Sequence, residues 1–552
     1  MSSLVETFEG DLGKLEIKEE YKEWPVVYLL LNDKDIYVGE TNDIEGRIEA
    51  HKSKIRDNKF KYIKIIFSKK FHKSAIYDIE TKLINYLFTD KKFNITNKGL
   101  NQKDLNYYNK NLYSNDYFNK IWSTLKQLKL VNKDLESLEN EFLFKYSPFK
   151  ALSSEQYKCV ESVLSNIFVE KYVINDDEFY ETENILNYTL KEEKTCSVIN
   201  GSPGTGKTLI AIKILKIISE LTERNSNVIG FCLPQASMRN EIKSLIKLMK
   251  ITNIKVISPS NIKDTNYDIL VIDEAHRLKE YTGIFSLYPF HLEIDKENNI
   301  YTNELELAIK QSKHLILLFD EFQKVRDSDI SNFKKHLPNW TVENNLSSQF
   351  RVKAGTNYIN VILNILQIKE EKVDFNLGEY DIKFVDSIEE LHKLIIEKEK
   401  IYTRCRMSSG YYVKLDKKNR ELRDEGKYCD FEAEGYKINW NTKLENWFNS
   451  DNAINEIGCI HTLQGYDLNY IGVIFGDEIT YNVDTKRIEI IPENYKDRNS
   501  FPLRRDPLFY EKLEATIKDI YYVLMTRGIR GTYLYVKDKN LEKYLKESLK
   551  IS

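Results

Sequence analysis

Residues 197–212 read SVINGSPGTGKTLIAI, an apolar run followed by a glycine-rich turn and the start of a helical pattern. In such a turn the backbone N–H groups can curl around phosphate oxygens, and the positive end of the following helix strengthens the attraction. Lys207 would reach the terminal phosphates and Thr208 would ligate magnesium. A glycine-rich turn with no ligand is the alternative, and the strand-turn-helix context argues against it. The predicted nucleotide-binding residues are Gly201, Pro203, Gly204, Thr205, Gly206, Lys207 and Thr208.

A second apolar run, at 267–272, ends in Asp273 and Glu274. Asp273 would hold the metal through water and Glu274 would orient the attacking water, as hydrolysis of a nucleoside triphosphate requires. An Asp-Glu pair is often only a solvated loop, but a pair that follows a buried strand downstream of a phosphate loop is typical of catalysis. The developing charge on the phosphoryl group also needs cations. Arg351 and Arg527 are the candidates, although a lone arginine is more often a surface salt-bridge partner.

Short apolar runs alternate with helical patterns downstream of the glycine-rich turn, which implies parallel sheets covered on both faces. Upstream, two apolar runs joined by an Asn-Asp turn, a further strand and two helical patterns predict a compact α+β module. We therefore predict a multidomain protein with a small α+β module followed by two α/β lobes. The predicted boundaries are 1–102 for the module (core 26–100), 103–150 for a helical connector, 151–375 for the first lobe and 376–552 for the second.

The composition fits a large protein with a substantial core, because 552 residues correspond to about three to five domains. Lys+Arg 82 against Asp+Glu 85 gives a formal charge of −3, so any nucleic-acid surface must be local. No apolar run approaches the length of a spanning helix, and the N-terminus lacks the basic and apolar parts of a signal peptide. The six cysteines never form a C-x-x-C pair, which argues against disulfides or a zinc knuckle. A cytoplasmic protein without membrane contact is expected.

Seven segments occur in the order of superfamily 1 helicase motifs: GSPGTGKT, Pro234-Gln235 before a helix, VIDEAH, LFDEFQ, SSQFR, IHTLQGYD and LMTRG. From about 150 to 550 the chain is similar to the bacterial Schlafen-like DNA/RNA helicase family. The DEAH spelling also occurs in another helicase superfamily, but the QFR and LMTRG segments favour superfamily 1. Residues 280–303 are expected to be an insertion, and 404–440 finds no match beyond Trp440, so whether such a motor translocates, unwinds or only switches stays open.

The helicase resemblance implies two RecA-like lobes that ATP closes and hydrolysis opens. It also assigns roles to single residues. Gln156 would read adenine, Gln323 would sense the γ-phosphate, and Arg351 and Arg527 would act as arginine fingers. Gly465 would contact the cofactor, and three residues would couple nucleotide state to the bound strand: Thr462, Gln464 and Asp467.

The N-terminal module carries the parts that phosphodiester hydrolysis needs, namely a base for water, a cation for the pentavalent phosphate and a metal ligand. Tyr28 and Tyr37 lie on adjacent predicted strands, and Arg47 and His51 are four residues apart on one helix face. Glu80 lies beside the apolar stripe of the second helix. Each residue has an ordinary alternative, such as a half-buried strand tyrosine, an ordinary helix histidine or a surface ion pair.

Together these residues, with Tyr28 in VYL and Tyr37 in YVG, resemble a GIY-YIG endonuclease over about 26–100. The resemblance makes Tyr28 or Tyr37 the general base or its relay. Its other implied roles are an ancillary proton carrier at His51, transition-state stabilisation by Arg47, the sole protein ligand of Mg²⁺ at Glu80, a bracing role for Asn94 and close backbone approach at Gly39. Residues 51–75 carry nine Lys/Arg against one Asp, which favours either a solvated face or phosphate contacts.

The two resemblances together imply an ATP- and Mg²⁺-dependent nuclease-helicase that cuts DNA in bacterial defence against phage or foreign DNA. One alternative is an ATP-dependent switch or sensor whose lobes bind nucleic acid or a partner and gate the nuclease without unwinding. Another is a DNA-repair nuclease. DNA is favoured over RNA, although nothing in the sequence reads a 2′-OH. A homo-oligomer would supply the two active sites that a double-strand cut needs.

Overall fold

The computed structural model divides into two compact units, Met1–Thr189 with Thr208–Glu223, and Leu190–Lys207 with Arg224–Ser552. No helix among the described residues is long and apolar enough to cross a membrane. The described residues are 6–12, 17–57, 59–97, 103–169, 189–222, 227–280, 292–295, 300–326, 328–330, 332–374, 376–411, 423, 429–433, 435–443, 447–463, 466–497 and 507–551.

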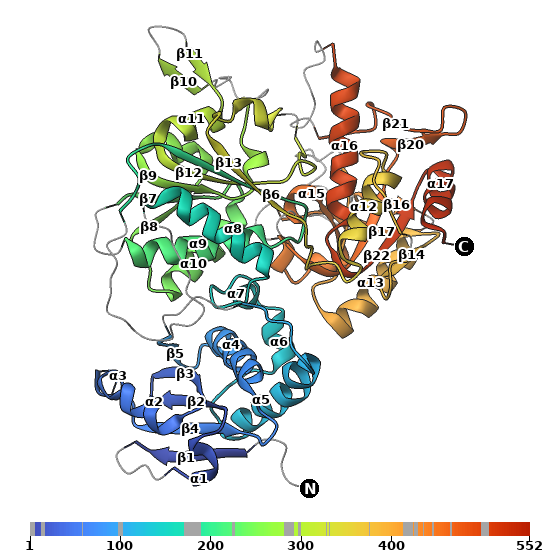
Figure 1. Ribbon diagram of the computed structural model, residues 1–552. Helices are drawn as coiled ribbons and strands as arrows, with labels where there is room; N and C mark the ends of the chain where they lie inside the picture. The colour runs from blue at the N-terminus through green and yellow to red at the C-terminus, as the bar shows by residue number, and fades with distance from the viewer. Residues whose placement is uncertain are drawn as a thin grey trace. The chain divides into compact units, whose positions relative to one another are not determined.

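The first unit begins with a five-stranded sheet in the order β1-β4-β2-β3-β5 (Figure 1). Its central hairpin forms because the Asn32 side chain accepts hydrogen bonds from the backbone N–H groups of Lys34 and Asp35, which closes the turn. The register sets Tyr28 opposite Gly39. The strands are β1 (Glu6–Asp11), β2 (Val26–Leu31), β3 (Asp35–Thr41), β4 (Tyr62–Phe67) and β5 (Asn94–Ile95).

Helices cover this sheet. In α2 (Ile44–Ala50) the Asp43 side chain caps the first turn, and the apolar residues of this helix join Tyr28, Tyr37 and their neighbours in one core. The long helix α4 (Lys73–Asp90) packs on β2 and β3. Two short helices, α1 (Glu19–Lys22) and α3 (Lys52–Asp57), complete the module.

The predicted connector is helical and folds onto α4. Its elements are η1 (Leu112–Tyr117), α5 (Phe118–Gln127), α6 (Leu135–Glu139) and α7 (Phe142–Lys145). The first unit also contains two longer helices. They are α8 (Ser154–Ile167), which begins with a capping box, and α9 (Lys207–Leu221), which directly follows the glycine-rich turn.

The described residues of the second unit contain two large sheets and two small hairpins. The first large sheet is wholly parallel in the order β13-β6-β12-β9-β7-β8. The glycine-rich turn follows β6 and the carboxylate pair follows β9, with β12 between these strands, so both motifs lie at the carboxyl edge of the sheet. The strands are β6 (Thr195–Gly201), β7 (Ile229–Cys232), β8 (Ile254–Ile257), β9 (Tyr267–Ile272), β12 (Ser312–Phe319) and β13 (Thr341–Leu346), with helices α10 (Ala236–Leu248) and α11 (Glu304–Gln311).

A small antiparallel hairpin, β10 (Leu292–Asp295) with β11 (Ile300–Thr302), lies in the stretch 280–303 that the helicase resemblance leaves unmatched. In the other unmatched stretch, 404–440, residues 412–422, 424–428 and 434 fall outside the described residues.

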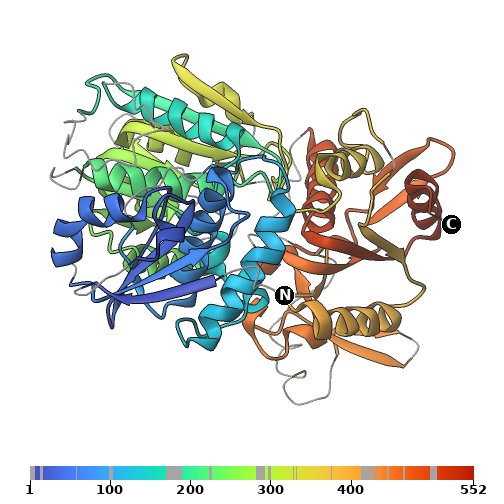
Figure 2. The same cartoon turned by 60° about the horizontal axis from the view of Figure 1, so that its bottom comes forward.

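The second sheet has the order β14-β22-β19-β15-β18-β17-β16, in which only the β16–β17 pair is antiparallel. One face packs against α12 (Gly355–Ile365), α16 (Phe509–Met525) and α17 (Lys539–Leu549), and the other against α13 (Ile388–Tyr402) (Figure 2). The strands are β14 (Asp381–Phe384), β15 (Arg406–Ser409), β16 (Phe431–Ala433), β17 (Tyr436–Trp440), β18 (Glu456–Cys459), β19 (Leu468–Phe475) and β22 (Gly528–Val536), with the hairpin β20 (Ile479–Asn482) and β21 (Arg487–Ile490) beside them. The predicted fold class, a small module followed by two parallel-sheet lobes, is confirmed.

Candidate active sites

The hydroxyl of Tyr28 reaches the edge of the sheet by crossing the backbone of Gly39. A Cβ atom on Gly39 would lie 2.4 Å from both Cζ and Oη of Tyr28, so only glycine lets the ring pass at this point. Tyr28 itself is buried, and burial, followed by the neighbouring Tyr37 hydroxyl, raises its pKa well above the usual value. Its phenol is therefore neutral at physiological pH.

Arg47 and His51 meet at that hydroxyl. Arg47 Nε donates to Tyr28 Oη at 3.3 Å, and His51 Nε2 lies 3.1 Å from the same oxygen. The ring of Tyr37 stands edge-on to His51, with the ring centroids 5.4 Å apart. Arg47 loses hydration by partial burial, but its hydrogen bonds with Tyr28 and Tyr37 outweigh that loss and raise its pKa. Four of the residues predicted for hydrolysis thus form one cluster.

Glu80 approaches from the other layer of the module, on α4. It is 3% exposed, and burial, followed by the negative charge of Glu40, raises its pKa well above the usual value, whereas Lys73 and Arg47 act in the opposite direction. Glu40, which directly follows Gly39, is itself buried and receives two hydrogen bonds from Lys73 Nζ at 2.6 and 2.8 Å. The structure thus sets Glu40 and Lys73 beside the predicted metal ligand.

Asn94 lies elsewhere in the module. Its amide donates to Asp35 at 3.0 Å, at the opening residue of β3. The asparagine that braces the middle of β3 is Asn97, which accepts from the Val38 N–H at 3.0 Å and donates to the Val38 carbonyl at 2.7 Å. The bracing role predicted for Asn94 stays a prediction.

The glycine-rich turn has the shape of a phosphate cradle. Gly204 and Gly206 both adopt φ of +85°, which residues with a side chain rarely adopt, and a Cβ on Gly204 would lie 2.5 Å from the Cβ of Arg351. Lys207 Nζ donates to the carbonyls of Gly201 and Ser202 at 2.5 and 3.2 Å. These carbonyls hold the ammonium where phosphate oxygens would receive it, so the turn fits a nucleotide.

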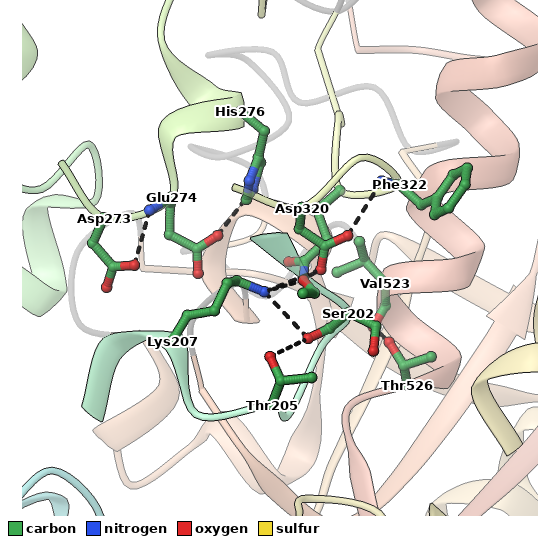
Figure 3. A network of polar contacts seen from close by, with 12 residues as sticks. Ser202, Thr205, Lys207, Asp273, Glu274, His276, Asp320, Phe322, Val523 and Thr526 are labelled. Carbon is green, nitrogen blue, oxygen red and sulfur yellow. Dashed lines mark hydrogen bonds and ion pairs between the residues drawn. The ribbon is translucent and has the colours of Figure 1, made fainter. Parts of the chain in front are cut away.

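The carboxylates after β9 are set in a strained turn. Glu274 has φ of +53°, and its carboxylate forms an ion pair with His276 Nε2 at 2.9 Å (Figure 3). Burial alone would raise the pKa of Glu274, but the pairing with His276, together with the charges of Lys207 and Arg527, lowers it. Asp273 is buried and accepts a hydrogen bond from the Glu274 N–H at 2.9 Å.

A chain of polar contacts joins the phosphate lysine to the second lobe. Lys207 Nζ lies 3.4 Å from Asp320 Oδ2, Gln323 Nε2 donates to the same oxygen at 2.6 Å, and Arg527 donates to Gln323 Oε1 at 3.3 Å (Figure 3 shows the Lys207 end). Arg527 is 2% exposed. Of these residues, Asp320 was not among the predicted site residues, although it belongs to the quoted segment LFDEFQ.

Arg351 forms an ion pair with Asp467 at 2.5 Å, so these two predicted residues contact each other across the lobes of the second unit. Thr462 donates to the Cys459 carbonyl at 2.9 Å. Gln464 and Gly465 lie outside the described residues.

Gln156 and Thr208 belong to the first unit. The side-chain oxygen of Gln156 accepts from the Ser153 N–H at 3.0 Å, which makes it half of the capping box of α8. Thr208 stands in the first turn of α9. The adenine and magnesium roles of these two residues stay predictions.

Among the described residues, no three His, Cys, Asp or Glu side chains gather closely enough to form a metal site by themselves. A divalent ion in the nuclease cluster would therefore need water or substrate phosphate among its ligands. Glu80 fits that role because its buried carboxylate makes no hydrogen bond or ion pair with any described residue.

Sequence reasoning missed four polar residues of these sites: Glu40, Lys73, His276 and Asp320. The sequence did offer a signal for Glu40 and His276, because Glu40 directly follows the YVG motif and His276 is the last residue of VIDEAH. Lys73 had none, because its partner lies 33 residues away in the sequence.

Comparisons with known proteins match both sites. Residues 194–538 match the model of the Schlafen group 3 DNA/RNA helicase domain, and residues 25–94 match the GIY-YIG catalytic domain. The uncharacterized protein YPL245W of Saccharomyces cerevisiae is 27% identical over 450 residues, which is 72% of this chain and 91% of that protein. Protein PFC0760c of Plasmodium falciparum is 25% identical over 218 residues, 38% of this chain but only 6% of that protein.

Among solved structures, S. cerevisiae Dbp5 bound to RNA and ADP BeF3 covers 77% of this chain and 92% of its own, at 12% identity. The TM-score of this match is 0.30.

Proposed function

This chain belongs to the Schlafen group 3 DNA/RNA helicase family and also carries a GIY-YIG catalytic domain, and from that premise we propose that it is a metal-dependent DNA nuclease coupled to an ATP-driven motor. The observation that carries the proposal is that each of two polar clusters contains a glutamate, Glu80 at 3% exposed and Glu274 with its side chain at 14% exposed. Glu80 lies near a tyrosine-arginine-histidine cluster, and Glu274 lies near a phosphate lysine and an arginine. Each set has the groups that hydrolysis of a phosphate bond needs.

In the nuclease cluster, Tyr28 is the tyrosine that relays the proton. Because an arginine can only donate, Tyr28 Oη accepts from Arg47 and directs its own hydrogen to His51 Nε2. A water that attacks phosphorus can pass its proton to Tyr28 as Tyr28 gives its proton to His51, so no phenolate accumulates. Arg47 then faces the negative charge that develops on the phosphate. A divalent ion held at Glu80 would act as a Lewis acid on the scissile phosphate.

In the motor, Glu274 stays ionised because the protein itself supplies its counter-charges, so it can orient a water and accept its proton. Lys207 would exchange the loop carbonyls for nucleotide phosphates. Asp320, Gln323 and Arg527 then connect the nucleotide to the second lobe, which gives ATP binding and hydrolysis a route to move that lobe.

Coupling between the two activities is supported by a polar stripe along α4. Four side chains spaced by four residues bind the connector, so they form one face of the helix that carries Glu80. Tyr107 donates to Asp78 at 2.8 Å, and Lys82 donates to the Ser114 carbonyl at 2.7 Å. The other two contacts are Tyr86 to Glu139 at 2.5 Å, and the Asn132 and Lys133 N–H groups to Asp90 at 3.0 and 2.8 Å.

The far end of the connector is held by α9, the helix that the glycine-rich turn opens. Lys213 of α9 is 2% exposed and donates to the Pro148 carbonyl at 2.8 Å. The contacts at Lys213 and along α4 therefore join the helix that follows the phosphate lysine to the helix of Glu80 inside the first unit. A movement of α9 that accompanies nucleotide binding can reach the nuclease by this route.

The lysine-rich stretch 51–75 supports a nucleic-acid substrate through phosphate contacts, which bring affinity without sequence preference, and we favour DNA over RNA. We favour defence against phage or foreign DNA as the biological setting, with repair as the competitor. A homo-oligomer would give the second active site for a double-strand cut.

The test compares the wild type with Lys207→Ala and Glu80→Gln. We expect the wild type to hydrolyse ATP faster with nucleic acid present and to cut DNA with Mg²⁺. Lys207→Ala should lose ATP hydrolysis, and Glu80→Gln should lose cleavage but keep ATP hydrolysis. Parallel assays with RNA identify the substrate. Unchanged turnover in Lys207→Ala, or cleavage that survives Glu80→Gln, would contradict the proposal.

A switch without unwinding is the second candidate, because the contacts from Lys207 through Asp320 and Gln323 to Arg527 connect the glycine-rich turn directly to the second lobe. Lobes connected in this way could report nucleotide or strand binding and gate the nuclease. A strand-displacement assay separates the two functions. ATP-dependent displacement supports the motor, and ATP-dependent cleavage without displacement supports the switch.

A further inference from the structure

Two buried carboxylates approach the same edge of the nuclease sheet, and an ammonium group is already bound to one of them. Tyr37 and Gly39 lie on the face of β3 that bears the Tyr28 cluster, because strand residues alternate between faces. Glu40 therefore faces the opposite layer, the layer of α4. Lys73 and Glu80, seven residues apart, lie on one face of α4 because two helical turns separate them. The Lys73–Glu40 contact shows that this face of α4 is turned toward Glu40.

The environment of each carboxylate differs. The Glu40 side chain is 1% exposed and its two oxygens both accept from Lys73, whose own side chain is 60% exposed. The Glu80 carboxylate, 3% exposed, has no hydrogen bond or ion pair among the described residues. A buried carboxylate without a counter-charge is costly, so the ionised form of Glu80 needs a further cation beyond the ammonium that Lys73 gives to Glu40.

We propose that Glu40 is a second carboxylate of the metal site and that Lys73 is its resident counter-ion, which a divalent cation displaces. This rests on the proposed metal-dependent nuclease and adds a residue to its metal site. Oxygen ligands from two carboxylates, completed by water and phosphate, suit Mg²⁺ or Mn²⁺. Lys73 can leave because most of its side chain is in solvent, and its ammonium is then free to contact a substrate phosphate.

This arrangement has a functional consequence. While Lys73 occupies Glu40, the site holds one positive charge and binds a metal weakly. When a metal ion and a nucleic-acid phosphate bind together, Glu40 contacts the metal ion and Lys73 contacts the phosphate. The presence of substrate therefore favours binding of the metal ion.

The experiment titrates the full chain, without nucleotide, with Mn²⁺ by isothermal titration calorimetry. Glu40→Gln should weaken Mn²⁺ binding by about tenfold, as loss of a supporting ligand does. Lys73→Gln should tighten binding by about threefold because it removes a competing charge. The double variant should bind like Glu40→Gln alone, since Lys73 acts through Glu40. Lys70→Gln, which removes an equal charge from an exposed position in the same segment, is the matched control and should not change binding.

A second readout is the rise in melting temperature on adding Mn²⁺, which follows affinity and shows in the same samples that each variant is folded. Unchanged Mn²⁺ binding in Glu40→Gln, with weakened binding in Glu80→Gln, would overturn the role of Glu40 and leave the proposed function intact. Weaker binding in Lys73→Gln would overturn the role of Lys73. If Glu80→Gln also binds Mn²⁺ as the wild type does, the metal site of the proposed function is itself wrong.

Discussion

Glu80 in the nuclease module and Glu274 in the motor are both largely buried, yet their pKa values are shifted in opposite directions. Glu80 has another carboxylate as its strongest charged neighbour, so its proton is held tightly. Glu274 has a histidine within an ion-pair distance of 2.9 Å and further cations beyond it, so its proton is released. Burial acts on both in the same sense, and the neighbouring charges decide the outcome.

The two sites therefore differ in the protonation state of their glutamate before any ligand binds. The motor provides its own cations and therefore has an ionised base before any ligand arrives. In the nuclease module, Lys73 and Arg47 offset only part of the effect of burial and of Glu40, so the pKa of Glu80 stays raised, and a metal ion bound there under the proposed function would displace the proton. Under the proposed function, the same residue type would therefore serve as a base in the motor and as a metal ligand in the nuclease module.

The strongest test exchanges each glutamate for its amide. Glu274→Gln should lower ATP turnover by about 10²- to 10⁴-fold, because the base for the attacking water is lost. Metal-dependent cleavage measured without ATP should stay as in the wild type, and Glu80→Gln should give the reverse pattern. Turnover and cleavage of both variants are measured in the same preparation. If one substitution abolishes both activities, the comparison between two separate sites fails.

A smaller effect is expected from Arg527→Lys. Lysine cannot reproduce the planar guanidinium that bonds Gln323, so ATP turnover should fall by about 10²-fold with cleavage in the absence of ATP retained. Arg530→Lys is the matched control, because Arg530 lies three residues further along, in β22, and its guanidinium lies over the Tyr402 ring instead of contacting Gln323. Equal losses in both variants would show that the effect is general to this segment and not specific to the contact with Gln323.

Removing one contact of the polar stripe on α4 should reduce the effect of ATP on DNA cleavage and leave each of the two activities by itself unchanged. Tyr86→Phe deletes the hydroxyl that bonds Glu139 and keeps the ring. We expect ATP turnover and ATP-free cleavage to be retained, and the stimulation of cleavage by ATP to fall by about threefold. Tyr62→Phe, at an exposed position of β4, should leave the stimulation intact. Full stimulation in Tyr86→Phe would count against this route.

The smallest effect concerns pH and Lys213, whose pKa burial lowers from 10.5 to about 7. Between these values the unfolded chain binds the proton more readily than the folded chain, so stability rises as the pH increases from about 7 to 10.5 and is independent of this group below about 7. Replacing Lys213 by Met removes this dependence. The difference in melting temperature between wild type and variant should therefore shift by about 2–4 °C in favour of the wild type from pH 7 to pH 9. A constant difference would show that Lys213 keeps an ordinary pKa in the folded chain.

Much of the architecture could be predicted from the sequence because it rests on local patterns. The strands around GSPGTGKT and VIDEAH, the N-terminal hairpin and the helix that bears Glu80 follow from apolar periodicity and turn residues. The cluster of Tyr28, Arg47 and His51 followed from a family resemblance, and the structure brings those three side chains together. Gly39 was predicted from the family resemblance, and the structure gives the physical reason for a glycine at this position, because the Tyr28 ring passes directly over its backbone.

Only the tertiary structure decided which side chains become partners. Lys73 bonds Glu40, and Asp320 bonds both Lys207 and Gln323, because strand order and helix packing bring distant residues together. Gln156 is the opposite case, because its partner is close in the sequence. Its side chain bonds the backbone of Ser153 in a capping box, whereas the family resemblance suggests that it binds adenine. By itself, the sequence determined the elements and the chemical groups at their ends, since both depend on neighbours along the chain. The charge state of each buried acid was decided by the fold, because a pKa depends on which charges lie nearby in space.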